Sequence, residues 1–346
     1  MLHSPRSGIV HRLARRVRNL LDAKAVILCY HRVADLSSDP FEIGVSSRLF
    51  AEQLEAVRKC GIPVSLTDLV EGLRKGRVPH RAVAITFDDG YADVLHEARP
   101  LLERHDVPAT AFLVSGAVGQ SGEFWWDELE RIFLQPGRLP QKLSMKIAGA
   151  DFHGELGDSR EYSEQAWQAQ RGWRFEQPAP GARQALFHRL HPLLGKLDEP
   201  DRKAAMGELR RWAGMPELAR ATHRTLDASE VVRLAAGGLV EIGGHTVSHP
   251  MLPTLSGDRQ RQEVAGCKSA IEQIVGRPIR HFCYPYGWHE DPTVQAVREA
   301  GYESACSLIP VPLRHRWDAM RLPRLWARPW AGEELERRLK GWFAGR

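Results

Sequence analysis

Short apolar runs alternate with amphipathic stretches along most of the chain. Residues 25–30 are apolar throughout, as is typical of a strand buried on both faces, whereas the apolar positions of residues 47–60 share one face of a helix. The same patterns predict further strands at 82–87, 110–114, 240–242, 281–284 and 304–308, and further helices at 92–104, 126–133, 227–236, 258–275, 292–300 and 333–340. Strands that alternate with helices predict a parallel sheet covered by helices, either open or closed into a barrel.

One long segment breaks this alternation and is rich in Gln, Arg, Pro and Gly. Within it, alternating positions near 143–152 predict a hairpin, and helical patterns follow at 182–194 and 202–212. We expect this segment to be an insertion or cap with a mixed or helical structure. The chain then divides into a basic arm at 1–24, an α/β core at 25–134 and 224–346, and the insertion at 135–223.

Composition narrows the class of protein. The chain has 346 residues, of which 43% are hydrophobic and 26% charged, so it can bury a sizeable core and is not disordered throughout. Its longest plainly apolar run is far shorter than the ~18–20 residues of a membrane-spanning helix, so no such segment is expected. Five cysteines, an odd number without CxxC spacing, argue against a disulfide framework and against a structural zinc ribbon.

The positive charge is concentrated at the start of the chain. Lys and Arg number 48 against 43 Asp and Glu, and five of the arginines lie in the first twenty residues. No apolar segment or cleavage site follows them, so we predict no secretory signal and expect a cytoplasmic location. A basic amphipathic arm is compatible with peripheral contact to a membrane or an anionic polymer, the alternative being a solvated helix. No nucleic-acid partner is expected, because no aromatic and basic recognition motif accompanies the charge.

Two adjacent carboxylates follow the predicted strand at 82–87, in Thr-Phe-Asp88-Asp89-Gly-Tyr. Like charges this close are costly unless a positive group separates their roles. A bound cation would do so, with one Asp as ligand and the other as a base. The alternative is a simple turn, since Asp-Asp-Gly is good turn chemistry.

Two histidines four residues apart, His245 and His249, follow the predicted strand at 240–242. We expect them on one face of a helical turn, at a spacing used for metal chelation. Together with Asp89 they would supply three protein ligands and leave a position open, as in catalytic metal sites. The alternative is an ordinary pair of surface or core histidines. A third motif, residues 280–287, is predicted to be a strand that stops on Pro-Tyr-Gly. Such a loop can expose a backbone N–H to a ligand and line a pocket with aromatic rings; the alternative is a plain strand exit.

In this order, the three motifs resemble the polysaccharide deacetylases of carbohydrate esterase family 4, the NodB-homology family. The family's motifs are a TFDDG strand end, an HxxxH turn and an RxxxxPYG strand end, and all three occur here. The resemblance covers roughly residues 25–134 and 224–330. It implies a distorted (β/α) barrel of about seven strands and a metal-dependent deacetylase active on N-acetylated sugars.

The resemblance also implies a role for each matching residue. Asp88 would be the general base, and the backbone N–H of Tyr286 would stabilise the oxyanion. The metal ligands would be Asp89, His245 and His249. Zinc is the expected ion, with cobalt and nickel as alternatives.

The general acid has two candidates. His315, in Leu-Arg-His, fits a C-terminal motif common in the family, but its arginine-rich setting is typical of an exposed loop. His31, in Cys-Tyr-His-Arg-Val, resembles the N-terminal YHxV segment of the poly-N-acetylglucosamine deacetylase branch, in which the barrel is circularly permuted. We favour His31; the alternative is a histidine satisfied by neighbouring backbone.

One position departs from the family pattern. Many members have an Arg where this chain has Cys283, and that Arg orients the catalytic base. Arg324, near a later strand end, is a candidate replacement, the alternative being a surface ion pair. Substrate contacts are expected from Arg324 itself and from four aromatic residues near the motifs: Tyr30, Tyr91, Tyr284 and Trp288.

These observations predict a metal-dependent deacetylase of N-acetylhexosamine units in a cell-surface polysaccharide or its precursor. Two alternatives remain open at this point. The first is the same fold with a different acyl substrate, such as a formylated amino sugar or a small amide. The second is a carbohydrate-binding protein of this fold that is catalytically weak.

Overall fold

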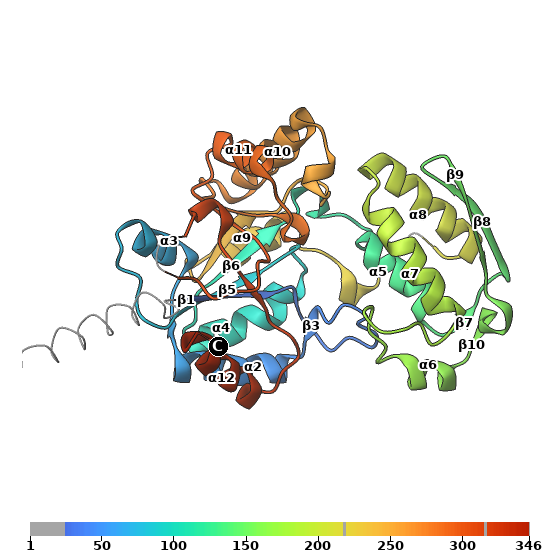
Figure 1. Cartoon of the computed structure of the whole chain (residues 1–346), viewed down its shortest axis with the longest axis horizontal. Helices are drawn as coiled ribbons and strands as arrows, with labels where there is room; N and C mark the ends of the chain where they lie inside the picture. Colours follow the sequence, from blue (N-terminus) through green and yellow to red (C-terminus); the bar gives the residue numbers. More distant parts are fainter. Residues whose placement is uncertain (1–24, 217–218, 315–316, 346) are drawn as a thin grey trace, which may run out of the picture.

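The computed structural model describes residues 25–216, 219–314 and 317–345. The basic arm at 1–24 and the candidate acid His315 lie outside the described residues. The chain forms two lobes, a larger one built on a parallel sheet and a smaller, largely helical one (Figure 1). The two lobes contain separate apolar clusters.

Seven strands of the larger lobe form one curled sheet in which every neighbouring pair is parallel. The strands are β1 (Ala25–Tyr30), β5 (Ala82–Phe87), β6 (Ala109–Leu113), β11 (Val240–Gly244), β12 (His281–Cys283), β13 (Ser304–Cys306) and β14 (Leu325–Trp326), in the order β13-β12-β11-β6-β5-β1-β14. A short strand, β4 (Ile62–Pro63), also pairs with β5. The expectation of a distorted (β/α) barrel of about seven strands is confirmed.

The two ends of this sheet are connected by the segment that leads into β14. Leu322 bridges Cys306 of β13 in parallel fashion, and its N–H donates to the carbonyl of Ala305. Three residues later, Leu325 pairs with β1 on the far edge. This segment therefore crosses the seam of the barrel, the gap between β13 and β1 where the two ends of the sheet meet. Arg324 lies on this segment.

Helices cover the outside of the sheet. They are α2 (Ser47–Cys60), α3 (Leu66–Arg74), α4 (Arg99–His105), α9 (Ala228–Ala235), α10 (Gly257–Val275), α11 (Asp291–Glu299) and α12 (Gly332–Phe343). The helix expected at 92–104 is in part wrong, because its first half is a π-helix, η1 (Val94–Ala98). Pro100 has no N–H to give to the preceding turn, which explains why regular α-helical bonding begins only afterwards.

The second lobe packs helices against two small antiparallel ribbons. Its elements are α5 (Trp125–Leu134), β7 (Gly137–Arg138), β8 (Lys142–Ile147), β9 (Ala150–Glu155), β10 (Glu161–Tyr162), α6 (Glu164–Gln170), α7 (Ala182–Gly195) and α8 (Glu199–Ala213). The hairpin and both long helices lie where the sequence predicts them. Helix α5, which we expected in the barrel, packs instead with α7 and α8. Its apolar face is evident in the sequence, but the helices that cover it come later in the chain.

All five cysteines are buried and free. Among the described residues, no helix combines the length and apolarity needed to cross a membrane.

Candidate active site

The sequence motifs meet at the carboxyl ends of the barrel strands, as ligand-binding residues do in parallel α/β folds. Asp88 and Asp89 follow β5, and His245 follows β11. Eight described residues other than glycine have a positive φ, and four of them belong to the motifs: Asp89, Thr246, His249 and Tyr286, with φ between 56° and 73°. Such strain costs about 1–3 kcal/mol per residue and clusters at functional sites.

Asp89, His245 and His249 form a buried group that fits a metal ion. The Nε2 atoms of His245 and His249 lie 3.6 and 3.5 Å from Oδ1 of Asp89. Tetrahedral ligands at 2.0–2.1 Å from an ion are about 3.3 Å apart, so these atoms need to move little to bind one. The donor set, two imidazoles and one carboxylate, is that of a catalytic zinc site with an open position.

Hydrogen bonds from two neighbouring segments hold the loop that carries the two histidines, residues 245–249, which we call the histidine loop. Nδ1 of His245 lies 2.8 Å from the carbonyl of Cys283, which leaves Nε2 free to bind a metal. Glu263, on α10, accepts hydrogen bonds from the N–H groups of Val247 and Ser248, both at 2.9 Å, and from the Ser248 hydroxyl at 2.8 Å. This carboxylate therefore fixes the middle of the loop.

The HxxxH segment is not a helical turn, which corrects our expectation. It is a bent loop after β11, in which Thr246 and His249 adopt left-handed backbone angles. The Thr246 hydroxyl accepts a hydrogen bond from the N–H of His249 at 3.0 Å. The two rings converge, with centroids 4.9 Å apart, because of this bend and not because of helical periodicity.

Burial sets the protonation of the three candidate ligands. It raises the pKa of Asp89 well above its usual value, and the neighbouring charges of Asp88 and Asp127 raise it further. Burial also lowers the pKa of His245 and of His249. Both imidazoles are therefore kept neutral, the form that binds a metal, and the buried carboxyl gains from a nearby cation.

Asp88 forms a bidentate ion pair with Arg324. The two Nη atoms of Arg324 lie 2.7 Å from the two carboxylate oxygens, and both side chains are buried. Burial alone would raise the pKa of Asp88, but the Arg324 charge and its hydrogen bonds outweigh burial and lower it. The carboxylate is therefore ionised and fixed in orientation.

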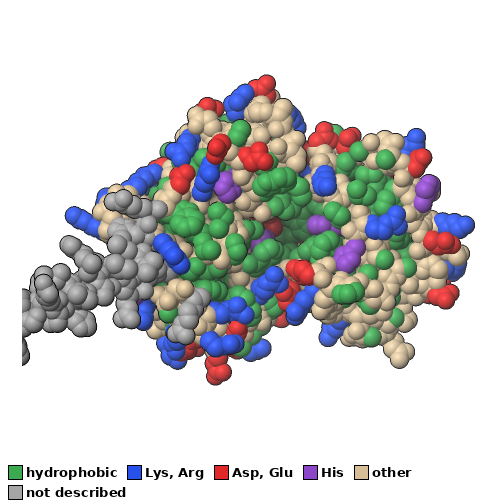
Figure 2. Space-filling view, in the orientation of Figure 1, with side chains coloured by type: hydrophobic (Ala, Val, Ile, Leu, Met, Phe, Trp, Pro, Cys, Tyr) green, Lys and Arg blue, Asp and Glu red, His purple; other side chains and the backbone are tan. Residues whose placement is uncertain are grey.

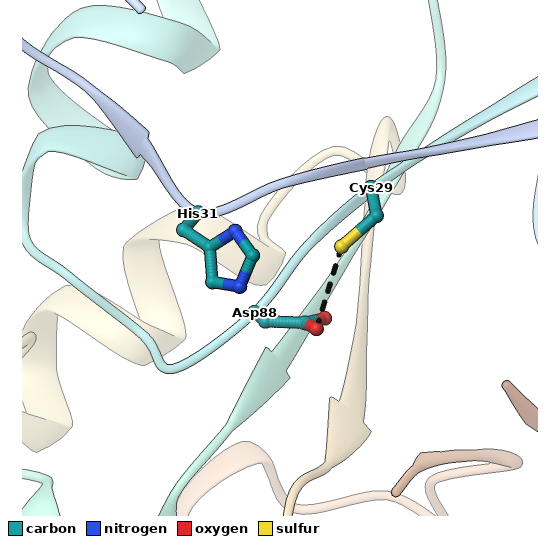
Figure 3. Close-up of side chains that lie close together, drawn as sticks. All are labelled: Cys29, His31 and Asp88. Carbon is teal, nitrogen blue, oxygen red and sulfur yellow. Dashed lines mark hydrogen bonds between the residues drawn. The ribbon is translucent and has the colours of Figure 1, made fainter. Parts of the chain in front are cut away.

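Two thiols complete the surroundings of Asp88. Cys29 and Cys283 each have Sγ 3.5 Å from Oδ2 of Asp88, and Cys283 also lies 2.9 Å from Nη2 of Arg324. Figure 3 shows Cys29, at the end of β1, bonded to this carboxylate. Burial raises the pKa of both thiols, so they remain neutral hydrogen-bond donors.

The structure brings His31 to the same place. Its ring lies beside Asp88 (Figure 3), and atoms of His31, Asp88 and Cys29 able to bind a ligand lie within 4.8 Å of one another. The ring packs on Trp326, with centroids 4.9 Å apart, and its Nδ1 is buried without a hydrogen-bond partner in the described structure. Burial lowers the pKa of His31 to about 4, against the opposing effect of Asp88.

Most of the expected substrate contacts are not available at the surface. Tyr30, Tyr91 and Tyr284 are buried, and their hydroxyls donate to Gln53, Asp127 and the carbonyl of Met320. We therefore assign these rings to packing. Arg324 is likewise buried under Asp88 and has no surface for a sugar, so its expected substrate contact is also corrected. Trp288 is 46% exposed and keeps its expected role as a prediction.

The second lobe reaches the site through the segment at 124–127, for which the sequence left open a sugar contact or a buried helix start. Trp126 of α5 packs on His249, with ring centroids 4.9 Å apart, and its Nε1 donates to the Tyr91 hydroxyl at 2.8 Å. That hydroxyl donates to Asp127 at 2.6 Å. The Trp-Trp-Asp segment was evident in the sequence, but its contact with a metal-site histidine depends on how α5 docks.

The chain can now be compared with known proteins. A family model described as polysaccharide deacetylase matches residues 75–137 and 192–305, just over half of the chain. Poly-beta-1,6-N-acetyl-D-glucosamine N-deacetylase of Staphylococcus aureus is 30% identical over 109 residues, 28% of this chain and 38% of that protein. The protein of the same name from Escherichia coli is 34% identical over 86 residues, 24% and 13% of the two chains. The match thus spans well under half the length of these relatives.

Solved structures share the fold over nearly the whole chain. The Streptococcus pyogenes deacetylase PplD in complex with acetate aligns with a TM-score of 0.56 and 16% identity, over 91% of this chain and 98% of its own. IcaB from Ammonifex degensii aligns with a TM-score of 0.55 and 18% identity, over 93% and 97%. The gap in the family match, residues 138–191, falls in the second lobe.

Proposed function

The chain belongs to the polysaccharide deacetylase family, and from this premise we propose that it is a metal-dependent hydrolase of N-acetylated hexosamine units in a cell-surface glycan or its precursor. The observation that carries the proposal is the position of Asp89, His245 and His249 beside the Asp88–Arg324 pair. These residues supply a metal site and a fixed, ionised carboxylate in one place. The partial similarity to poly-N-acetylglucosamine deacetylases supports an N-acetylglucosamine polymer as the substrate class.

Each residue has a distinct task in this proposal. A divalent ion held by the three ligands would polarise the acyl carbonyl and acidify a water molecule. Asp88 accepts the proton of the attacking water, and Arg324 keeps its carboxylate aimed. The backbone N–H of Tyr286 donates to the oxygen on which negative charge develops.

His31 provides the proton for the leaving amine. With a pKa of about 4, it is neutral near pH 7 and must first gain a proton. Asp88, which has just received one from water, has a carboxylate oxygen within 4.8 Å of a His31 ring nitrogen and passes the proton on through one bridging water molecule. The proton taken from water thus reaches the amine nitrogen, the C–N bond breaks, and the products are acetate and a free amino sugar.

The test is turnover by the protein loaded with Zn²⁺, Co²⁺ or Ni²⁺. N-acetylglucosamine oligomers are incubated with each preparation, and released acetate and free amine are quantified together. N-formyl and N-propionyl oligomers serve as matched substrates for the choice of acyl group. Acetate release that requires metal and is abolished in Asp88→Asn supports the proposal. Metal-loaded protein that binds glycans but releases no acyl group from any of them would overturn it.

A further inference from the structure

A cavity lies between the two lobes, on the side of the histidine loop that faces α8. Its volume is about 610 Å³. Four segments line it: the chain from Val114 through η2 (Ser115–Ala117) to α5, residues 125–131 of α5, residues 199–210 of α8, and residues 247–248 of the histidine loop. Figure 2 shows the surface hollowed between the lobes. Neither the family motifs nor the proposed mechanism uses the α8 side chains.

Most charges around this cavity are balanced by close partners. Glu123 pairs with Arg220 at 2.9 Å, Glu128 pairs with Arg210 at 2.9 Å, and Arg131 lies near both carboxylates. At the rim, Lys203 pairs with Glu199 at 2.5 Å. These pairs leave little net charge for a ligand to balance.

Arg202 is the exception. It lines the cavity and is only 4% exposed, yet its guanidinium bonds to two neutral carbonyls, those of Leu197 and Ser248, both at 3.0 Å. Only two of its five N–H groups have these partners. Within the described part of the chain, no carboxylate lies within ion-pair distance of it; Glu199, Glu263 and Asp198 act on it only from farther away. Its guanidinium also lies over the Trp125 ring, 5.9 Å from the ring centroid, and a ring face carries no full counter-charge.

A buried cation without a counter-charge is expensive, and proteins normally pair it. Arginine is also well suited to bind carboxylate and phosphate groups, because its planar fork matches two oxygens at once. The hydrogen bond from Arg202 to the Ser248 carbonyl places the guanidinium next to His249. The histidine loop also forms one wall of the cavity.

We propose that the inter-lobe cavity binds an anionic substituent of the glycan, a carboxylate or a phosphate, through Arg202. This deepens the proposed function: the substrate is an acidic glycan in which a charged unit lies close to the N-acetylated hexosamine that is hydrolysed. The second lobe then contributes to specificity, since α8 carries the arginine.

The experiment measures binding by calorimetry to the metal-loaded protein, so that it does not depend on turnover. The probes are a tetrasaccharide of alternating N-acetylglucosamine and glucuronate, its carboxyl methyl ester, and an N-acetylglucosamine tetramer with and without 6-phosphate. We expect one charged member of these pairs to bind at least 10-fold more tightly than its neutral partner at low salt, and the advantage to fall as salt rises. The better charged probe identifies carboxylate or phosphate. Equal binding of both charged probes and their neutral partners would overturn the proposal.

Variants test whether the preference for the charged probe depends on the charge of Arg202 or on its role in packing. Arg202→Lys should keep much of the preference for the charged probe, and Arg202→Gln should abolish it. Lys203→Glu places a negative charge at the rim and should reduce the preference several-fold, whereas Lys146→Glu, the same change on β8, should not. Metal content is measured on each variant. If Arg202→Gln loses its metal, Lys203→Glu decides; an unchanged preference in Lys203→Glu would then reject the site.

Acetate release, measured in parallel on the neutral N-acetylglucosamine tetramer, keeps the two proposals apart. A protein that prefers the charged probes but hydrolyses none of the glycans keeps the cavity assignment and refutes the proposed function. A protein that hydrolyses the neutral tetramer and shows no charge preference refutes only the cavity.

Discussion

Arg324 and Asp88 lie 236 residues apart in the chain and form a buried, bidentate ion pair with two 2.7 Å bonds. From the motif resemblance, we expected the arginine that orients the base at the position of Cys283. Here the guanidinium approaches from the segment that crosses the barrel seam, and the smaller thiol contacts its Nη2. A guanidinium thus reaches Asp88 from the segment that precedes β14.

Substituting Arg324 tests this relationship. Arg324→Lys keeps the positive charge but cannot form the bidentate hydrogen bonds to both carboxylate oxygens of Asp88. We therefore expect turnover to fall roughly 10–100-fold. Arg324→Gln leaves Asp88 buried and unpaired, so the free energy of unfolding should also fall by about 3–5 kcal/mol. Arg298→Lys, at an exposed pair with Asp318, is the control and should change neither quantity. If Arg324→Ala is partly rescued by Cys283→Arg, the two positions are interchangeable sources of the cation.

Substituting each of the two adjacent aspartates should distinguish the general base from the metal ligand. Asp88→Asn is expected to retain metal, but its turnover should fall about 10²–10⁴-fold, which is the usual contribution of a general base to the rate. Asp89→Asn is expected to lose metal, because it removes the only carboxylate among the three candidate ligands. Metal content by mass spectrometry and acetate release are measured on the same preparations. The reverse pattern of metal loss would exchange the two assignments.

His31 and His315 can be ranked by single substitutions. His31→Ala should cost far more activity than His315→Ala, because His31 lies beside Asp88. The comparison uses kcat on an N-acetylated oligomer, with metal content as a check on the site. Equal losses in the two variants would reject His31 as the proton donor to the amine.

Glu263 should act on the metal site without touching the ion. It accepts three hydrogen bonds from the loop between the two histidines, and such supporting groups typically contribute 10–100-fold in metal affinity. We therefore expect Glu263→Ala to weaken Zn²⁺ binding by about that factor, measured by competition with a chelator. Asp258→Asn, exposed on the same helix, is the matched control. Unchanged affinity in Glu263→Ala would mean that the loop holds its shape without this carboxylate.

A pH effect on stability is expected from Glu230, which lies on α9 and is not one of the candidate metal ligands. Hydrogen bonds from Arg224 lower the pKa of Glu230 to about 2, and Glu230 also closes the capping box of α9 with Asp227. Because the pKa is lower in the folded state, the stabilisation is complete above the unfolded value near 4.5 and is lost as pH falls towards 2. Glu230→Gln should thus lower the free energy of unfolding by about 1–3 kcal/mol at pH 7. The gap between wild type and variant, followed by denaturant unfolding, should narrow below pH 5 and close only near pH 2; a constant gap would contradict the prediction.

The sequence by itself determined the periodic elements and the identity of the chemical groups. The strand at 25–30 and the helix at 47–60 lie where the pattern predicts them, because local hydrophobic periodicity reflects which face is buried. The motif residues Asp89, His245 and His249 were also recognisable, since their order and spacing are written along the chain.

Tertiary structure decided which residues meet. The histidine loop bends through left-handed backbone angles that no helical pattern predicts, and α5 docks on helices that follow it in the chain. Arg324 reaches Asp88 only because the segment that leads into β14 crosses the seam of the barrel, and Arg202 bonds to the Ser248 carbonyl only because α8 packs beside the histidine loop. These contacts join segments tens to hundreds of residues apart, and packing between distant surfaces leaves no local signature in the sequence.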